Sequence, residues 1–335
     1  MQMKESLFYE KSGNGRVHCR LCPQECVIDH DKRGNCRVRL NQKGILYSEN
    51  YGRLTSLNTD PIEKKPLYHF YPGSSIFSVG SAGCNLHCRF CQNFEISQSG
   101  VGDLLPDTFT SAEIVETALR KKENIGIAYT YNEPTVFFEF MLETALAAKE
   151  KGLKNVMVSN GFINPDPLAM LADVIDAFNI DLKSFSEPFY KNVVGGKLQP
   201  VLENLKFIRG RKKHLEVTHL VVTGLNDQIT DFGEMIRWIK SELGQDTVLH
   251  ISRYFPRYRH NSPPTPELKL QEFYDAAKEE LRFVYMGNIG GITGHDTVCP
   301  VCGKTVIFRQ GYAINASMLD GKGACRSCGE HIAVQ

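Results

Sequence analysis

Short apolar runs alternate with amphipathic segments through most of the chain. Seven of these runs are rich in Val, Ile, Phe and Tyr and are short enough to be buried strands. They lie at residues 75–82, 126–132, 155–161, 178–184, 215–224, 247–254 and 282–288. Between them, apolar residues recur at intervals of three and four, which is the period of a helix with one buried face.

The amphipathic segments predict the helices that connect these strands. They cover residues 110–123, 134–152, 165–175, 198–208, 229–244 and 267–281. Thr110 and Glu113 have the spacing of a capping box, in which the two side chains satisfy amide groups at the start of a helix. The alternation predicts an α/β fold whose parallel strands are joined by right-handed crossovers. The order of elements alone fits either a barrel or an open sheet.

Polar side chains gather where the predicted strands end. The positions are Tyr131, Asn132, Glu133, Ser159, Asn160, Asp181, Lys183 and His250. In a parallel barrel the carboxyl ends of the strands form one mouth, where catalytic and ligand-binding groups meet. Each residue alone is more often a turn former or a helix cap. Their joint position favours a partial barrel with a site at its mouth.

The whole chain has the composition of an ordinary soluble protein. Its 335 residues are 42% hydrophobic and 23% charged, and 39 basic against 38 acidic side chains leave a net charge of +1. No apolar run approaches the roughly 18 residues of a membrane-spanning helix. The first 13 residues lack the apolar core of a secretory signal. We therefore expect a cytoplasmic protein without a membrane partner.

One surface stretch has a composition suited to phosphate contact and base stacking. Residues 252–260 interleave three arginines with three aromatic side chains, Arg253, Tyr254, Phe255, Arg257, Tyr258 and Arg259. The balanced charge of the chain lacks the broad basic footprint of a nucleic-acid-binding protein. A solvated loop with aromatic packing is the favoured interpretation, and a nucleic-acid partner is not favoured.

The eleven cysteines fall into three groups of four, three and four. The groups are Cys19, Cys22, Cys26 and Cys36, then Cys84, Cys88 and Cys91, then Cys299, Cys302, Cys325 and Cys328. A disulfide framework is unexpected in a long chain without an export signal, and the odd total would leave one thiol unpaired. The spacings therefore predict metal sites.

The middle group, within GCNLHCRFCQN, supplies three thiols inside eight positions. A structural zinc site uses four protein ligands, so a compact trio indicates a metal centre with room for another ligand. The C-x3-C-x2-C spacing, followed by repeating strands and helices, resembles the radical S-adenosylmethionine (SAM) enzymes. That resemblance implies a [4Fe-4S] cluster on Cys84, Cys88 and Cys91, with SAM bound at the iron that has no cysteine.

The same resemblance implies a set of SAM contacts. Asn132 and Glu133 match the Gly-Gly-Glu motif of the family, although its glycines are absent here. Ser159 and Asn160 match its ribose and carboxylate contact, and Phe90 matches its aromatic residue beside adenine. The activating enzymes of pyruvate formate-lyase have an Asp-x-Lys pair and a late-strand histidine, which Asp181, Lys183 and His250 resemble.

Residues 15–290 also resemble a narrower group, the radical SAM member of the AmmeMemoRadiSam system. The implied reaction is reductive cleavage of SAM to a 5′-deoxyadenosyl radical, which abstracts hydrogen from a protein substrate, as in an activase. The implied partners are a one-electron reductant such as a ferredoxin or flavodoxin, and Memo-type or AMMECR-type proteins. Modification of a small molecule or nucleic acid is the alternative, and a non-enzymatic iron–sulfur electron carrier is the third hypothesis.

The other two cysteine groups each have four thiols. The first reads C-x2-C-x3-C-x9-C and fits either zinc or an auxiliary iron–sulfur cluster. The last, CPVCG and CRSCG, has the paired knuckles of a zinc ribbon, so zinc is favoured. We expect three parts: a metal-binding region with four cysteines at 1–75, a radical SAM (β/α)6 partial barrel at 76–297, and a zinc-ribbon-like module at 298–335. Because its four ligands are local, we expect the last part to fold independently.

Overall fold

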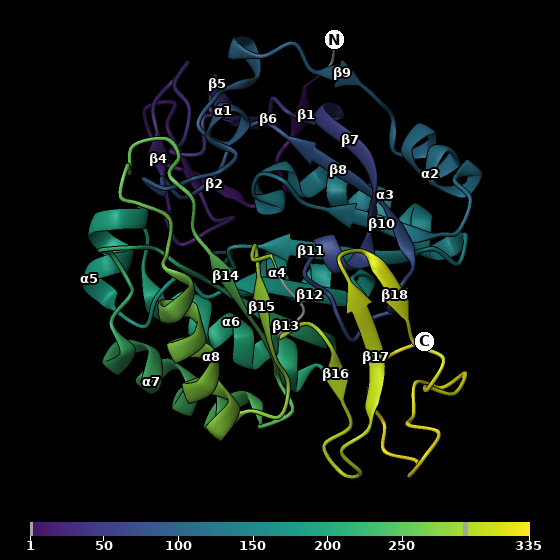
Figure 1. Ribbon diagram of the computed structural model, residues 1–335. Helices are drawn as coiled ribbons and strands as arrows, with labels where there is room; N and C mark the ends of the chain where they lie inside the picture. The colour runs from purple at the N-terminus through teal and green to yellow at the C-terminus, as the bar shows by residue number, and fades with distance from the viewer. Residues whose placement is uncertain (1–2, 291–293) are drawn as a thin grey trace.

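A curved sheet of nine strands forms the centre of the protein (Figure 1). The structure, a computed structural model, describes residues 3–290 and 294–335. Seven strands of the sheet run parallel in chain order: β8 (Ser75–Ser81), β10 (Asn124–Tyr129), β11 (Lys154–Ser159), β12 (Ala177–Asp181), β13 (His214–Val221), β14 (Val248–Arg253) and β15 (Val284–Gly287). All seven predicted strands are therefore present, and they form a partial barrel.

Helices cover the outer face of this sheet (Figure 1). They are α2 (Ser111–Arg120), α3 (Phe138–Glu150), α4 (Pro165–Val174), α5 (Glu187–Phe189), α6 (Leu198–Gly210), α7 (Ile229–Trp238) and α8 (Glu267–Glu280). Short helical turns extend several of them: η3 (Pro134–Phe137), η4 (Tyr190–Val194) and η5 (Ile239–Leu243). The predicted capping box is confirmed, because Thr110 and Glu113 each accept a hydrogen bond from the other's amide, at 2.8 and 3.2 Å.

The sheet begins upstream of the predicted boundary at residue 76. Strand β7 (Arg53–Pro61) pairs antiparallel with β8, and β9 (Asp107–Thr108) pairs with the outer side of β7. After β7 the chain passes through η1 (Ile62–Lys64), and residues 62–71 enter the concave side of the sheet. There Ile62, Leu67 and Phe70 pack on barrel residues such as Ala128 and Val156. Residues 62–71, the plug, close the interior of the barrel.

Glu216 on β13 fastens the plug to the barrel. Its side chain is fully buried and accepts hydrogen bonds from the backbone amides of Tyr68 and His69, at 2.9 and 2.7 Å. It also accepts from Nε2 of His214 and of His250, at 2.8 and 2.6 Å. Burial by itself would raise the pKa of Glu216, but the two histidine hydrogen bonds outweigh it and leave the pKa well below its usual range.

The C-terminal module packs on the plug and on β15. It contains β16 (Thr297–Val298), β17 (Thr305–Gln310) and β18 (Ala313–Asn315), and Val306, Ile307 and Ile332 share one buried core with Phe283 and Tyr285 of the barrel. The four-cysteine spacing suggested an independent unit, which the shared core does not support. The four cysteines can bind a metal ion without help from the barrel. The apolar side chains of the module, however, are buried against the plug and the barrel.

The N-terminal part forms two small antiparallel sheets beside the barrel mouth. One holds β1 (Lys4–Glu5), β6 (Ile45–Ser48) and β5 (Arg39–Gln42), and the other holds β2 (Tyr9–Lys11), β3 (Val17–Cys19) and β4 (Val27–Ile28). Two further short turns, α1 (Phe94–Ser97) and η2 (Val101–Asp103), follow the middle cysteine group. No helix among the described residues is both long and apolar enough to cross a membrane.

We expect the protein to lose stability as the pH falls from about 6.5. Burial lowers the pKa of His69 from 6.5 to about 3 and that of His219 from 6.5 to about 4. The folded state therefore binds fewer protons than the unfolded state below pH 6.5, and stability declines toward those folded values. The decline should be about 1 kcal/mol per histidine and pH unit.

Denaturant titration at pH 7 and pH 5 measures this effect. His69 lies between the carbonyl of Ile332 at 2.8 Å and the hydroxyl of Tyr285 at 2.6 Å. His69→Phe, which cannot be protonated, should reduce the pH dependence. Equal stability of the unmodified protein at the two pH values would contradict the expectation.

Candidate functional site

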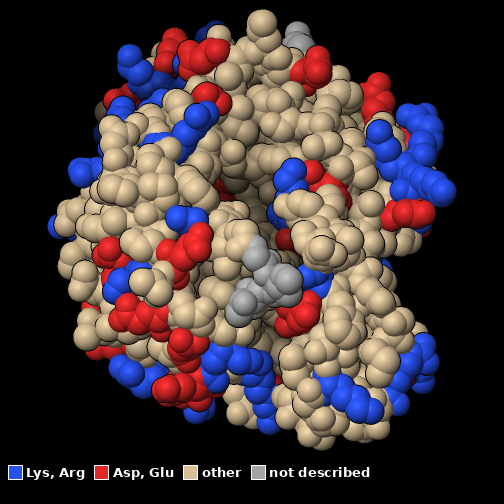
Figure 2. Space-filling view, in the orientation of Figure 1, with Lys and Arg blue, Asp and Glu red and all other residues tan. Residues whose placement is uncertain are grey.

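One cavity of about 570 Å³ opens at the carboxyl ends of the parallel strands. It lies where this face of the molecule is hollowed, with charged side chains at the rim (Figure 2). All the predicted cluster and SAM residues except His250 line it: Cys84, Cys88, Phe90, Cys91, Asn132, Glu133, Ser159, Asn160, Asp181 and Lys183. A cavity of this size is in the range that holds a small-molecule cofactor.

The three cysteines come from the loop between β8 and α1. The amide of Leu86 lies 3.4 Å from Sγ of Cys84, and the hydroxyl of Ser97 lies 3.2 Å from Sγ of Cys91. Burial raises the pKa of Cys88 to about 12 and that of Cys84 well above its usual value. Buried thiols are inert unless a metal replaces their protons, and the three open on one cavity. They therefore fit a metal cluster.

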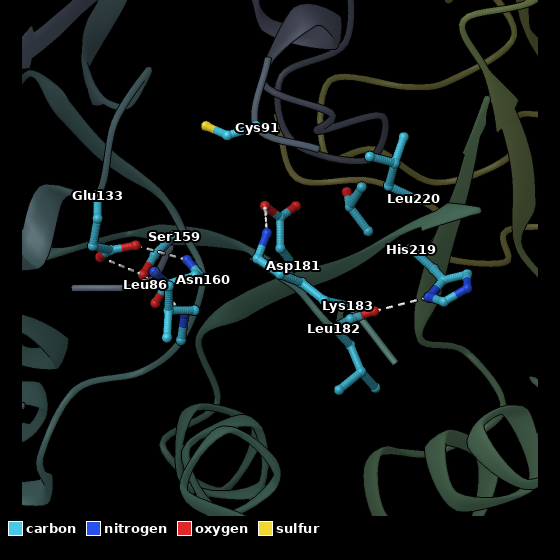
Figure 3. A network of polar contacts seen from close by, with 12 residues as sticks. Leu86, Cys91, Glu133, Ser159, Asn160, Asp181, Leu182, Lys183, His219 and Leu220 are labelled. Atoms are coloured by element: carbon cyan, nitrogen blue, oxygen red, sulfur yellow. Dashed lines mark hydrogen bonds and ion pairs between the residues drawn. The ribbon is translucent and has the colours of Figure 1, made fainter. Parts of the chain in front are cut away.

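Glu133 organises the side of the cavity formed by β10 and β11. Its carboxylate accepts from the hydroxyls of Thr135 and Ser159, at 2.7 and 2.8 Å, and from the amide of Asn160 at 2.8 Å. Burial raises the pKa of Glu133. Figure 3 shows Glu133, Ser159 and Asn160 together on one side of the site. Glu133 therefore fixes the loop after β11.

At the end of β10, a tyrosine adopts a backbone conformation that usually requires glycine. Tyr131 stands at the first position of the motif that matches Gly-Gly-Glu, and its φ of 72° lies in the left-handed region that favours glycine. Its hydroxyl donates to Asp60 at 2.7 Å. Asn132 donates to the carbonyl of Gly83 at 2.8 Å, which ties this turn to the cysteine loop. The backbone conformation is thus reached without the glycines.

Asp181 and Lys183 form an ion pair at the end of β12. Nζ of Lys183 lies 2.9 Å from Oδ2 of Asp181, and the side chains are 15% and 38% exposed, the lysine being the more buried. Burial alone would lower the pKa of Lys183, but the negative charge of Asp181 outweighs it and raises the pKa. In Figure 3 the pair lies beside the Glu133, Ser159 and Asn160 group, with Cys91 above it. A partly exposed carboxylate and a fixed ammonium can bind complementary charges of a ligand.

His250 does not line the cavity, so the structure does not support its assignment as a SAM contact. It is the third residue of β14, two positions short of Ser252, and its Nε2 donates to buried Glu216. Its ring also packs edge-on against Tyr68 at 4.7 Å. Because the plug occupies this depth of the barrel, His250 contacts the plug.

The cavity also has lining residues that sequence patterns did not select. They include Lys64, Lys65, Asn93, Ser97 and Leu220. Lys65 is buried and pairs with Asp60 at 2.6 Å. The adjacent lysines Lys64 and Lys65 could have indicated a binding site for a negatively charged group, but they lie before the first predicted strand. Their place at the mouth depends on the path of the plug.

The arginine-rich stretch at 252–260 packs on the cysteine loop. Tyr258 stacks on Phe94 with 4.7 Å between ring centroids, and Arg257 pairs with Glu95 at 3.2 Å. The amide of Arg259 donates to the carbonyl of Arg89 at 2.9 Å. These contacts fit the favoured interpretation of a loop with aromatic packing.

The last cysteine group is compact enough to hold a metal ion. The sulfurs of Cys299, Cys302, Cys325 and Cys328 all lie within 4.8 Å of one another. Residues 3–290 and 294–335 contain no other group of three or more His, Cys, Asp or Glu gathered so closely around a point. The spacing suits one tetrahedral ion.

Comparisons with known proteins relate the chain to one superfamily and to several proteins. The Radical SAM superfamily matches residues 78–239. An uncharacterized protein of Methanocaldococcus jannaschii is 43% identical over 335 residues, covering 98% of this chain and 99% of its own. The pyruvate formate-lyase-activating enzyme of Streptococcus mutans is 24% identical over 188 residues, covering 49% of this chain and 67% of its own.

Solved structures share the fold. The Streptococcus suis protein SuiB, bound to SAM, superposes with a TM-score of 0.51 at 13% identity, over 64% of this chain and 49% of its own. A radical SAM methyltransferase from Sphaerobacter thermophilus also has a TM-score of 0.51, at 15% identity, over 65% of this chain and 67% of its own. At these identities the likeness is one of fold.

Proposed function

Because the chain belongs to the radical SAM superfamily, whose members are enzymes, we propose that it cleaves SAM reductively and uses the radical to abstract hydrogen. The observation that carries this proposal is the convergence of Cys84, Cys88 and Cys91 with polar strand ends on one cavity. When bound, a [4Fe-4S] cluster and SAM supply the electron and the 5′-deoxyadenosyl radical. The protein supplies ligands, orientation and exclusion of water.

The residues of the cavity divide these tasks. Cys84, Cys88 and Cys91 hold the cluster and leave one iron for SAM. Asp181 and Lys183 present opposite charges from one strand end, so they can orient the charged methionine end of SAM. Phe90 is 4% exposed and lines the cavity beside the cysteines, where it can pack on the adenine ring.

Other residues hold the backbone of the cavity wall in place. Glu133 holds Ser159 and the amide of Asn160, while Nδ2 of Asn160 lies 3.8 Å from Sγ of Cys84. Asn132 ties the end of β10 to the cysteine loop through Gly83. This side of the cavity is therefore preorganised, so less ordering is needed when the ribose and carboxylate of SAM bind.

The favoured substrate is a protein, as in an activase. Its support is the similarity to pyruvate formate-lyase-activating enzymes and to a Haemophilus influenzae protein named as a glycyl-radical enzyme activating enzyme, 27% identical over 131 residues. A ferredoxin or flavodoxin would supply single electrons, and Memo-type or AMMECR-type proteins would be partners. Zinc would occupy the compact C-terminal site. A small-molecule substrate is the second candidate.

Product analysis tests the reaction. Protein reconstituted anaerobically with iron and sulfide should convert SAM to 5′-deoxyadenosine and methionine when a reductant is added. Protein without iron is the control. Equal amounts of 5′-deoxyadenosine from the two samples would exclude the proposed reaction.

Asp181→Ala should weaken SAM binding by about tenfold to a hundredfold, because a hydrogen bond to a charged group contributes about 1.5 to 3 kcal/mol. The iron content should stay unchanged, since the carboxylate is paired with Lys183 and not with a cysteine. Equilibrium dialysis with labelled SAM and an iron assay measure the two quantities. Asp231→Ala, at an exposed position of α7, is the matched control. Loss of iron from the Asp181 variant would place this residue in the cluster site instead.

A further inference from the structure

The first cysteine group lies around a second cavity, next to the SAM cavity. Cys19, Cys22, Cys26 and Cys36 line it from β3 and the loops on either side of β4. The cavity is small, about 20 Å³, and nearly all of its lining is apolar. The amide of Asn35 points at Sγ of Cys26 from 3.4 Å. Leu86 and Cys84 make the same kind of N–H to sulfur contact in the middle group.

The arrangement of these thiols differs from that of the C-terminal site. Four sulfurs on one zinc ion stand about 3.8 Å apart, as follows from Zn–S bonds of about 2.3 Å in a tetrahedron. Such sulfurs leave no room between them for even a water-sized sphere. The four N-terminal thiols line a cavity instead, and among the described residues only the C-terminal cysteines gather tightly enough for a single ion. A cluster needs the wider spacing, because each cysteine binds a different iron.

A buried cation also faces this cavity. Arg39 lines it with a side chain that is 2% exposed and pairs with Glu139 at 2.7 Å. Its Nε is buried without a hydrogen-bond partner among the described residues. A thiolate-bound iron–sulfur cluster carries negative charge and accepts hydrogen bonds at its sulfurs. A buried guanidinium beside the cavity, with one N–H still unpaired, suits that group.

The two cysteine groups are in direct contact through their loops. A side chain at Gly83 would stand 2.5 Å from the carbonyl oxygen of Cys36, so the backbones touch there. Asn85 follows Cys84 in the chain and lines the N-terminal cavity. Gln24 donates to the carbonyl of Asn85 at 2.9 Å, and Asn35 lies 2.9 Å from Nε2 of His87. The loops that carry the two cysteine groups therefore pack directly on each other.

We propose that Cys19, Cys22, Cys26 and Cys36 hold a second [4Fe-4S] cluster, which relays single electrons to the cluster on Cys84, Cys88 and Cys91. The N-terminal cluster takes one electron from a low-potential one-electron donor and is reduced. It returns to the oxidised state when it passes that electron to the second cluster. The relay rests on the proposed function, whereas the presence of the N-terminal cluster does not.

Metal analysis of a variant without the middle group tests the cluster. Cys84→Ala/Cys88→Ala/Cys91→Ala, reconstituted anaerobically with iron and sulfide, should retain about four irons and four sulfides per chain. Its Mössbauer spectrum should be that of a [4Fe-4S] centre. In the reciprocal variant, Cys22→Ala/Cys26→Ala, those irons should be lost while the irons of the middle group remain. A triple variant that binds a second zinc ion and no iron would overturn the proposal, as would iron retained in full by a variant lacking both groups.

The relay has its own readout. SAM cleavage by the Cys22→Ala/Cys26→Ala variant is driven either by reduced flavodoxin or by dithionite, a small reductant that can enter the SAM cavity. The ratio of the flavodoxin-driven rate to the dithionite-driven rate should fall at least tenfold relative to the unmodified protein. An unchanged ratio would exclude the relay even if the cluster is present. No cleavage by the unmodified protein with either donor would instead contradict the proposed function.

Discussion

Serine in place of Cys88 should abolish SAM cleavage, lowering 5′-deoxyadenosine to the level of protein without iron. A serine hydroxyl is a poor ligand for the soft irons of a cluster, and its pKa keeps it protonated. Among the residues that the structure describes, only three thiols line the SAM cavity, so none can substitute for Cys88. The measurement is 5′-deoxyadenosine formed under anaerobic reducing conditions, together with iron per chain.

The same loop offers a matched control. Arg89 follows Cys88 and is exposed, and its backbone carbonyl accepts a hydrogen bond from the amide of Arg259. Arg89→Ala keeps that carbonyl and should therefore retain its iron and its cleavage rate within about twofold, as expected for a surface substitution. The circular dichroism of both variants should match that of the unmodified protein, because the cysteine lies in a loop. Full cleavage by Cys88→Ser would remove the assignment of the trio.

The strands and the mouth of the barrel were predictable because their signals are local. A buried parallel strand needs an apolar run of a few residues, and each of the seven runs became a strand. Residues at or just after the end of such a strand must lie at the carboxyl edge of the sheet, so Glu133, Ser159 and Asp181 line one cavity. Thr110 and Glu113 capped their helix because both partners lie within one turn.

The interior of the barrel was not predictable, because it depends on contacts between distant segments. Residues 62–71 have no strong period, and nothing local says that they fill the barrel. His250 faces the same side of the sheet as Asp181, since both are in register with Thr218. Their surroundings separate them: His250 contacts Glu216 and the plug residue Tyr68, while Asp181 borders the cavity. The sequence pattern predicts on which face of the sheet a side chain lies. It does not predict which distant segment covers that face.

The C-terminal module shows the same limit. Its cysteine spacing predicted the compact sulfur cluster correctly, since all four ligands are local. Its attachment depends on Arg309, which is 4% exposed and donates to the carbonyl of Tyr68 at 2.7 Å. From sequence alone, an arginine in a strand is expected to be exposed to solvent. Its burial here depends on the plug, which is distant in the sequence. The module and the plug therefore stabilise each other.

Glu216→Ala should lower the free energy of unfolding by about 3 to 5 kcal/mol, the usual cost of removing one partner from a buried charged network. The carboxylate accepts four hydrogen bonds, from the amides of Tyr68 and His69 and from the rings of His214 and His250. Alanine would leave these buried donors without an acceptor and would loosen the plug on which the C-terminal module packs. Urea titration followed by circular dichroism measures the change. Glu279→Ala, at an exposed position of α8, is the control and should stay within about 0.5 kcal/mol of the unmodified protein. A Glu216 variant as stable as that control would show that the four donors find other partners and that Glu216 does not hold the plug in the barrel.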